Sequence, residues 1–428
     1  MNLIIRNGRV VDPSQNLDEE IDIIVENGKI AKLRKNLKAP DFKEINAKGL
    51  IVFPGFIDMH THLREPGYEY KEDIESGTKA AAAGGITSVA CMANTNPIND
   101  NEGVTSYIIE KAKDVSKINV FPIGAISKGM KGEELVEMGY IAEAGAVGFS
   151  DDGFPVRSSL VLRRALEYQR IVDKIIIEHA EDLELSENGV ANESPLTYKL
   201  GLKGIPSASE TAIISRDIEI LRQVGGRIHF AHLSSRWSVE LIENAKRNGL
   251  NVSAEVTPHH LLLNESYVET FSPLYKMKPP LRAEEDRIAL VEGLKKGIID
   301  VIATDHAPHT EDEKELEFGF APFGVIGLET VVGLIFDRLV MSGIISMQRF
   351  AELMSKNPAK ILGLDSKGSL EIGKDGDITI VDPEKKVTID PNKFMSKAKN
   401  SPFIGWEVKG WPVYTIVEGN IVFPFEED

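Results

Sequence analysis

The 428-residue sequence contains a single cysteine, Cys91. One cysteine cannot form a disulfide within the chain, and such sparing use of cysteine is typical of proteins that work in the reducing cytoplasm. No apolar run approaches the roughly 18 residues that a membrane-spanning helix requires. Residues 1–8 also lack the basic start and long apolar stretch of a signal peptide. We therefore expect a cytoplasmic protein that does not span a membrane.

Basic residues are outnumbered, since 49 lysines and arginines stand against 66 aspartates and glutamates and give a formal net charge of -17. A surface of this charge repels a phosphate backbone unless basic residues are segregated, and the sequence contains no basic block. We therefore expect no nucleic-acid partner. The hydrophobic share of 42% is enough for a large core in a chain of this length.

The two ends of the chain differ from its middle. Both ends contain short β-type runs separated by turns, such as residues 21–25 and 411–417. Neither end is large enough to form a good core alone. We therefore predict a small composite β domain, a β-sandwich assembled from residues 1–52 and 365–428, around an inserted catalytic domain of residues 53–364.

The inserted residues alternate apolar, strand-like runs with helical stretches. Eight such strands with helices between them predict an α/β fold, a (β/α)8 TIM-type barrel, and no fixed-period repeat competes with this interpretation. Predicted helices include residues 72–83, 132–144, 207–224 and 284–296. The predicted strands are residues 52–58, 86–92, 118–123, 146–150, 175–179, 227–232, 251–256 and 300–304.

Candidate metal ligands recur at the carboxyl ends of the predicted strands. His60 and His62 lie at the first of these ends, and side chains two apart on a strand point the same way. Such a pair alone is as often an ordinary strand end, and a lone buried histidine is usually a hydrogen-bonded core residue. Joint placement favours a site, because active sites of such barrels lie at the carboxyl ends of the strands. The further candidates there are Asp151 or Asp152, His179, His232 and Asp305.

The chemistry of this set indicates metal-assisted hydrolysis. Four imidazoles and two carboxylates suit a borderline ion such as Zn²⁺ and are too many for one tetrahedral centre. Two ions about 3.5–4 Å apart, bridged by a carboxylate, would use all six residues, activate water at neutral pH and polarise a carbonyl. Strand position alone does not choose between Asp151 and Asp152.

Seven strings distributed over nearly the whole chain carry a family resemblance. They are HTHLR (60–64), CMANTNP (91–97), FSDDG (149–153), EHAE (178–181), AHLSS (231–235), PPLR (279–282) and TDHAPH (304–309). Together they resemble the bacterial class I dihydroorotases of the amidohydrolase superfamily. The resemblance implies a zinc-dependent enzyme that reversibly cyclises N-carbamoyl-L-aspartate to L-dihydroorotate and water, a step of pyrimidine biosynthesis.

The resemblance also implies the roles of the metal-site residues. His60, His62 and Asp305 would hold one zinc ion, His179 and His232 would hold the second, and Asp152 would bridge the two. Asp305 would be the catalytic residue, which takes a proton from the attacking water and passes it to the leaving nitrogen. Related hydantoinases and some other dihydroorotases use a carboxylated lysine as the bridge, but residues 145–150 contain no lysine.

Substrate binding is assigned by the same resemblance. Arg64 lies one alternation beyond His62 and can offer a planar fork to the carboxylate of dihydroorotate. Two positions depart from the family pattern: Lys278 stands in place of the usual asparagine, and Ala93 in place of the usual proline. A lysine can still pair with an anionic substrate, but as a point charge and not as an amide. The implied substrate-binding residues are His62, Arg64, Asn94, Lys278, His309, Phe323 and Gly324.

Other interpretations are open at this stage. Allantoinase and dihydropyrimidinase share the fold and the metals, but they normally place different residues after the strand-8 aspartate and use a lysine bridge. A non-catalytic homologue that scaffolds aspartate transcarbamoylase would be expected to lack some ligands, whereas this chain has all six. The family further implies a homodimer, and in some members an association with aspartate transcarbamoylase.

Several other residues near the predicted site have structural interpretations. We interpret His229, His259 and His260 as packing residues, and His306 as a group that orients a metal ligand. Cys91 is interpreted as a small buried apolar residue. We interpret residues 311–317 as a solvated loop at the barrel mouth, with a lid as the alternative.

Overall fold

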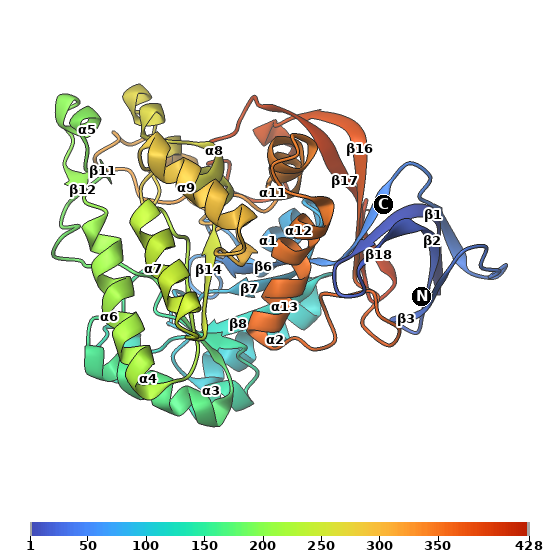
Figure 1. The fold of residues 1–428 in the computed structure, drawn as a ribbon, viewed down its shortest axis with the longest axis horizontal. Coiled ribbons are helices and arrows are strands. Elements are labelled where there is room, and N and C mark those ends of the chain that lie inside the picture. The colour runs from blue at the N-terminus through green and yellow to red at the C-terminus, as the bar shows by residue number, and fades with distance from the viewer. Residues whose placement is uncertain (1, 426–428) are drawn as a thin grey trace.

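The structure is a computed structural model that describes residues 2–425. Its larger part is a barrel of eight parallel strands surrounded by helices (Figure 1). The strands neighbour one another in chain order, so that each crossover leads to the next position around the barrel. These strands are β6 (Phe56–Thr61), β7 (Ile86–Cys91), β8 (Asn119–Gly124), β9 (Gly148–Phe149), β10 (Ile175–Glu178), β13 (Ile228–Phe230), β14 (Val252–Val256) and β15 (Val301–Ile302).

The barrel closes where β6 meets the segment after β15. Asp58 accepts hydrogen bonds from the backbone amide of Thr304 at 3.2 Å and from its hydroxyl at 2.6 Å. Further along, Thr61 and His306 form a parallel bridge, and the amide of His62 donates to the carbonyl of His306. Closure therefore brings the end of the first strand beside the loop that follows the last.

The longer helices follow the strands, and some of them begin at a side chain that caps the first turn. Asp73 forms a capping box with Ser76 at the start of α1, and Ser158 caps α4. The carboxyl end of α6 is at Gly225, whose φ of +73° favours glycine. These helices are α1 (Ile74–Ala83), α2 (Glu102–Val115), α3 (Met138–Glu143), α4 (Ser159–Val172), α6 (Ala208–Val224), α7 (Arg236–Arg247) and α9 (Glu284–Lys295).

Short helices fill the loops and complete the ring. After the last strand the chain forms two composite helices, each with a π-type segment: α11–η4, and α12–η5–α13. The short elements are η1 (Lys128–Met130), α5 (Pro195–Lys199), α8 (Pro258–Leu262), η2 (Glu265–Thr270), η3 (Pro273–Tyr275), α10 (Glu311–Lys314), α11 (Val331–Ile335), η4 (Phe336–Met341), α12 (Met347–Ala351), η5 (Glu352–Lys356), α13 (Asn357–Leu362) and η6 (Pro391–Lys393). Two short strands, β11 (Ala191–Asn192) and β12 (Gly204–Ile205), pair beside α5.

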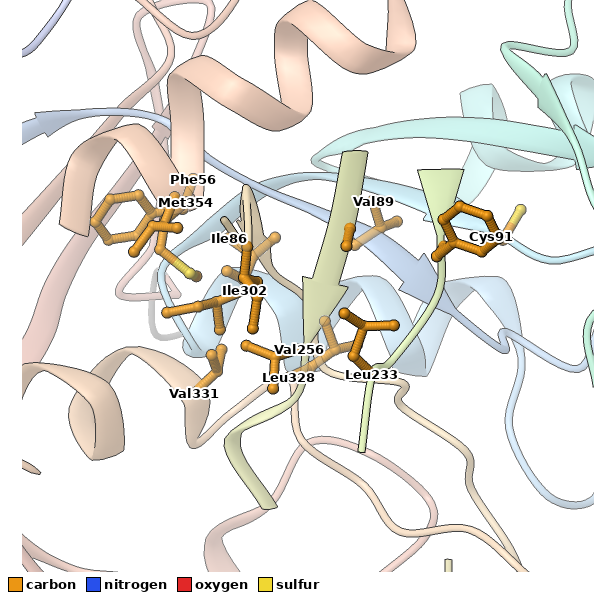
Figure 2. Packing of buried hydrophobic residues seen from close by; sticks show 14 of the residues in the cluster. Phe56, Ile86, Val89, Cys91, Leu233, Val256, Ile302, Leu328, Val331 and Met354 are labelled. Atoms are coloured by element: carbon orange, nitrogen blue, oxygen red, sulfur yellow. The ribbon is translucent and has the colours of Figure 1, made fainter. Parts of the chain in front are cut away.

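The barrel core lies between the strands and the helices. Figure 2 shows strand residues such as Ile86 and Ile302 packed near Val331 of α11 and Met354 of η5. All four side chains are at most 1% exposed. Burial of this apolar surface is the main term that stabilises the barrel and fixes its strand ends in place.

Both ends of the chain build a second sheet at one end of the molecule (Figure 1). Its order is β18-β17-β16-β5-β1-β2-β3, with β4 paired in parallel to β1. The structure therefore contains the expected α/β barrel and a β domain to which both termini contribute. The strands are β1 (Leu3–Asp12), β2 (Leu17–Glu26), β3 (Lys29–Arg34), β4 (Lys43–Asn46), β5 (Ile51–Pro54), β16 (Ile378–Thr388), β17 (Glu407–Val417) and β18 (Asn420–Phe423).

Aromatic packing joins the sheet to the barrel. The ring centroids of Phe53 in β5, Phe56 in β6 and Phe350 in α12 lie 5.2–5.6 Å apart, and all three rings are fully buried. Edge-to-face contacts of this kind are favourable beyond the area they bury. The first strand of the barrel is therefore fixed directly to the small domain.

Two predicted strands or helices of the barrel differ from the structure by more than two residues at an end, and the others of the barrel agree within two. The first predicted strand, residues 52–58, is two strands: β5 belongs to the small sheet and β6 to the barrel, with Gly55 between them. A Cβ at Gly55 would lie 2.3 Å from the hydroxyl oxygen of Thr87, so only glycine fits this crossing. The predicted helix 132–144 is only α3, because the segment before it pairs with residues near Ser127 and cannot be helical.

None of the helices within residues 2–425 combines the length and the apolar character needed to cross a bilayer.

Candidate active site

The six candidate ligands meet at the carboxyl end of the barrel. His60 lies in β6 and His62 directly after it, and the other four follow the ends of β9, β10, β13 and β15. Every one of these side chains is buried, with at most 7% of the residue surface exposed. His232 and Asp305 take left-handed backbone conformations, with φ of +30° and +48°. Such conformations are costly for residues other than glycine and are found preferentially at functional sites.

The ligand atoms form two groups that share one carboxylate. Within each group all candidate ligand atoms lie within 4.8 Å of one another. The first group is His60, His62, Asp152 and Asp305, and the second is Asp152, His179 and His232.

Asp152 presents one oxygen to each group. Its Oδ2 lies 3.3 Å from His60 Nε2 and 3.4 Å from His62 Nε2. Its Oδ1 lies 3.1 Å from His179 Nδ1 and 3.2 Å from His232 Nε2. Asp305 completes the first group, with Oδ1 3.0 Å from His62 Nε2 and 3.4 Å from His60 Nε2. One carboxylate therefore faces both groups, and each group could hold a cation.

His60 and His179 each contact a carboxylate through one ring nitrogen, so that the other ring nitrogen points into its ligand group. His60 Nδ1 lies 2.5 Å from Glu255, while its Nε2 is buried and has no hydrogen-bond partner in the described chain. His179 Nε2 lies 3.2 Å from Glu181, so that its Nδ1 faces the Nε2 of His232 at 2.9 Å. Two ring nitrogens that converge on a carboxylate suit a shared cation better than they suit each other. The residues therefore fit a metal ion.

The electrostatics of the cluster also favour positive charge. Burial opposes the charged form of His60, but the carboxylates of Asp152, Glu255 and Asp305 outweigh it and raise its pKa well above the ordinary value. Burial is likewise outweighed at His179, where Asp152 and Glu181 raise the pKa of the imidazole to about 10. For Asp152, burial is outweighed by His60 and His179, which hold its pKa well below the usual range. The carboxylates therefore favour positive charge among these histidines, and a bound metal cation would supply it in place of protons.

The structure distinguishes the two adjacent aspartates after β9. Asp151 accepts the backbone amides of Ile126 and Ser127 at 2.8 and 3.0 Å, and the Ser127 hydroxyl donates to its other oxygen. Its carboxylate is therefore occupied in fixing the loop after β8. Asp152 is the one that faces the histidines.

Two carboxylates that hold the ligand histidines were missed by the sequence analysis. Glu255 in β14 contacts His60 Nδ1 through one oxygen and His229 Nε2, at 3.1 Å, through the other. Glu181 holds His179 from the opposite side. A carboxylate that orients an imidazole raises the basicity of the ligand. The available signal was Glu255 itself, because a charge inside an otherwise apolar strand requires a buried partner.

An open pocket of about 290 Å³ lies over this cluster. Polar groups and backbone converge in it above the metal-type ligands, as in the usual arrangement of a small-molecule site. All the residues that the sequence analysis assigned to substrate binding line it: His62, Arg64, Asn94, Lys278, His309, Phe323 and Gly324.

The hydrogen bonds around the pocket orient its donors. Asn94 Oδ1 lies 2.9 Å from His62 Nδ1, so Asn94 accepts through its oxygen here and its amide nitrogen is the atom that can donate to a substrate. Arg64 Nε donates to the carbonyl of Pro308 at 3.3 Å. His309 Nε2 lies 2.9 Å from the carbonyl of Phe323, so its ring is fixed against the backbone at residues 323–324.

Lys278 lines the pocket but is already paired. Its ammonium lies 2.7 Å from Glu181 and 5.4 Å from the centroid of the Phe323 ring. Its charge therefore acts on the carboxylate that holds His179 as well as on the pocket. Ala93 is fully buried, and its carbonyl accepts the amides of Thr95 and Asn99.

The other histidines and residues 311–317, in the loop after β15, take structural positions. His229 and His260 are held by Glu255 and Thr257, and His259 is buried beside His260. His306 does not hold a ligand side chain, contrary to our interpretation: it lies 3.4 Å from Glu72 and accepts the amide of Gly327. Residues 311–314 of the loop are helical, as α10.

Comparisons with known proteins match this chain to dihydroorotases and to the amidohydrolase family. A family model described as dihydro-orotase-like matches residues 49–238, and a model of the amidohydrolase family matches residues 325–423. A curated dihydroorotase of Geobacter metallireducens is 53% identical over 99% of this chain and 100% of its own length. A dihydroorotase of Acetivibrio thermocellus is 50% identical over 98% of each chain.

Solved structures with the same fold include hydantoinases. An L-hydantoinase (dihydropyrimidinase) from Arthrobacter aurescens has a TM-score of 0.89 at 28% identity, covering 98% of this chain and 96% of its own. A D-hydantoinase (dihydropyrimidinase) from Thermus sp. has a TM-score of 0.83 at 27% identity, covering 98% and 94%.

Proposed function

This chain belongs to the dihydroorotase family, and from that membership we propose how its residues perform the reaction. It is a cyclic amide hydrolase that interconverts L-dihydroorotate and N-carbamoyl-L-aspartate, a step of pyrimidine biosynthesis. The observation that carries the proposal is Asp152, which directs one oxygen to each of two ligand groups beneath a pocket with cationic and amide donors.

We propose two zinc ions per subunit. His60, His62 and Asp305 would hold one, His179 and His232 would hold the other, and Asp152 would belong to both. Imidazole and carboxylate donors in these numbers suit Zn²⁺. Such ions supply a water activated at neutral pH and polarise the ring amide carbonyl.

The protein residues then handle the proton and the substrate. We assign Asp305 to take a proton from the attacking water and deliver it to the ring nitrogen as the amide bond breaks, since its carboxylate lies in the first ligand group and lines the pocket. We assign Arg64, Asn94 and His309 to the substrate carboxylate. His62, Lys278 and the backbone of Phe323 and Gly324 would complete the substrate contacts around the ring.

Replacement of Arg64 by lysine should raise the KM for dihydroorotate about tenfold, which corresponds to roughly 1.4 kcal/mol. The guanidinium can meet a carboxylate with two parallel hydrogen bonds, whereas an ammonium meets it as a point charge. Steady-state kinetics on Arg64→Lys and on a surface control, Arg222→Lys, measure the difference. An unchanged KM in Arg64→Lys would remove this residue from the substrate site.

Replacement of Glu255 by glutamine should weaken zinc binding by about 10- to 100-fold, because the carboxylate no longer supports the imidazole of His60. Competition with a chromogenic chelator measures the zinc affinity. The matched control is Glu178→Gln, a buried carboxylate of β10 that accepts the amide of Val156 and faces away from the cluster. Equal zinc affinity in both variants would contradict the role given to Glu255.

The solved hydantoinases point to a second candidate, another cyclic amidase such as dihydropyrimidinase or allantoinase. We favour dihydroorotate because the pocket contains Arg64 beside the amide of Asn94, donors that suit a substrate carboxylate that dihydrouracil lacks. We further propose a cytoplasmic homodimer that can associate with aspartate transcarbamoylase and that has no nucleic-acid or membrane partner.

Reversibility tests the proposed reaction. Zinc-loaded protein supplied with L-dihydroorotate, or separately with N-carbamoyl-L-aspartate, should reach the same mixture of the two compounds at a given pH. Chromatography of both mixtures measures the approach. If zinc-loaded, folded protein converts neither compound, the proposal is rejected.

A further inference from the structure

Two lysines beside the pocket are buried. Lys276 follows η3 and is 2% exposed, and Lys314 ends α10 and is 8% exposed. Within residues 2–425 the structure shows no ion pair for either ammonium. An unpaired buried charge is expensive, so its retention requires that the ammonium be hydrogen-bonded where it lies.

Lys314 holds the backbone at the edge of the pocket. Its ammonium donates to the carbonyls of Pro322 and Gly324, each at 2.9 Å, and lies 3.4 Å from the carbonyl of Lys276. That last carbonyl also accepts the amide of Gly324 at 3.0 Å. The loop after β15 is thereby tied to the segment after η3 at the residues that line the pocket.

Lys276 holds the same loop at a second place. Its ammonium donates to the carbonyls of Phe318 and Gly319 at 2.7 and 3.0 Å. It also lies 4.7 Å from the centroid of the Phe323 ring, within the range of a cation–π contact. The same ammonium lies 5.6 Å from the centroid of the Phe318 ring. The loop from α10 to Gly324 is therefore held by two ammonium groups through backbone carbonyls and two aromatic rings.

The arrangement has a cost that packing alone does not explain. Burial lowers the pKa of Lys314 to about 7 and that of Lys276 to about 8. Apolar side chains in these places would fill the space without desolvating two ammonium groups. They would leave the carbonyl of Pro322 without the partner that Lys314 gives it, and the loop without its two ties.

We propose that Lys276 and Lys314 are positioning residues that clamp residues 315–324 and so place the backbone of Phe323 and Gly324 for the substrate ring. The proposal rests on the proposed function for its effect on substrate, but not for its effect on the loop. Neither lysine reaches the reacting atoms. Both act through the carbonyl groups that they hold.

Lys276→Met and Lys314→Met test the clamp by two readouts. A glutamate-specific protease should cut each variant at the exposed Glu315 and Glu317 at least about tenfold faster than the wild type, because the loop opens more often. The KM for dihydroorotate should rise about tenfold while kcat changes less than about threefold, since the loop backbone binds the substrate ring and takes no part in the chemical step. The matched control is Lys295→Met on the outer face of α9, where the lysine side chain is 41% exposed and pairs with Glu292.

The outcomes separate the clamp from the function. Unchanged cleavage and unchanged KM in both variants would overturn the clamp, and a loss of kcat without a change in KM would show that the lysines act elsewhere. If the wild type fails to convert dihydroorotate, the proposed function fails, and the cleavage rates still decide whether the lysines hold the loop. Lys314→Gln, which keeps an N–H donor, should be cut at an intermediate rate; it replaces Lys314→Met if that variant does not fold.

Discussion

Asp305→Asn should lower kcat for dihydroorotate hydrolysis about a thousandfold, within the range expected for loss of a general acid–base group. The carboxylate lies 3.0 Å from His62 Nε2 and lines the substrate pocket. Asparagine keeps an oxygen that can face the first ligand group, but it cannot accept and return a proton. Turnover should therefore fall far more than zinc content.

Measurement of kcat and of bound zinc on the same preparation separates these effects. Asp312→Asn, an exposed aspartate of α10, is the matched control and should leave both quantities unchanged. A fall in kcat of less than about tenfold with zinc retained would mean that another group moves the proton. Loss of zinc in parallel with kcat would make Asp305 a ligand only.

Asp152→Ala should abolish detectable turnover and reduce bound zinc in both ligand groups. The reason is geometric: Asp152 directs Oδ2 to His60 and His62, and Oδ1 to His179 and His232. Removal of Asp152 also leaves the second group, His179 and His232, without a carboxylate ligand. Zinc content after gel filtration, together with activity, measures the effect.

Two controls accompany this variant. Asp151→Asn changes the neighbouring aspartate, which is bonded to the loop after β8, and should retain its zinc and its turnover. Chelation of the wild type should abolish turnover, and added zinc should restore it. A zinc-free wild type with full activity, or an Asp152→Ala variant with full zinc content, would contradict the proposed metal centre.

The candidate ligands could be found in the sequence, and the structure brings them together, because two simple rules coincide. The period of a strand puts His60 and His62 on one side, and the barrel topology brings strand ends from distant parts of the chain to one place. The choice of Asp152 over Asp151 needed more. It depended first on the family resemblance, and the structure then showed the Asp151 carboxylate bonded to Ile126 and Ser127.

The supporting contacts could not be predicted, since they depend on register across the barrel. Glu255 and His60 are 195 residues apart in the chain and meet only because the closed barrel brings β14 and β6 together. The partners of Lys276 and Lys314 are backbone carbonyls, which carry no sequence signal. A sequence therefore indicates which side chains bear the chemistry more readily than it indicates what holds them.

The break at Gly55 was missed for a related reason. Residues 51–59 read as one apolar run, because both sheets bury the chain at that point. The glycine is needed where the chain leaves one sheet and enters the other, close to Thr87. Only the three-dimensional crossing shows why the run must be divided.

Turnover of L-dihydroorotate beside dihydrouracil, hydantoin and allantoin by zinc-loaded protein tests the central claim most directly. We expect hydrolysis of dihydroorotate alone, because the Arg64 guanidinium can bind a carboxylate that the other three rings lack. Hydrolysis of dihydrouracil or hydantoin at a comparable kcat/KM would contradict the account, since the cationic side of the pocket would then contribute nothing to the choice of substrate.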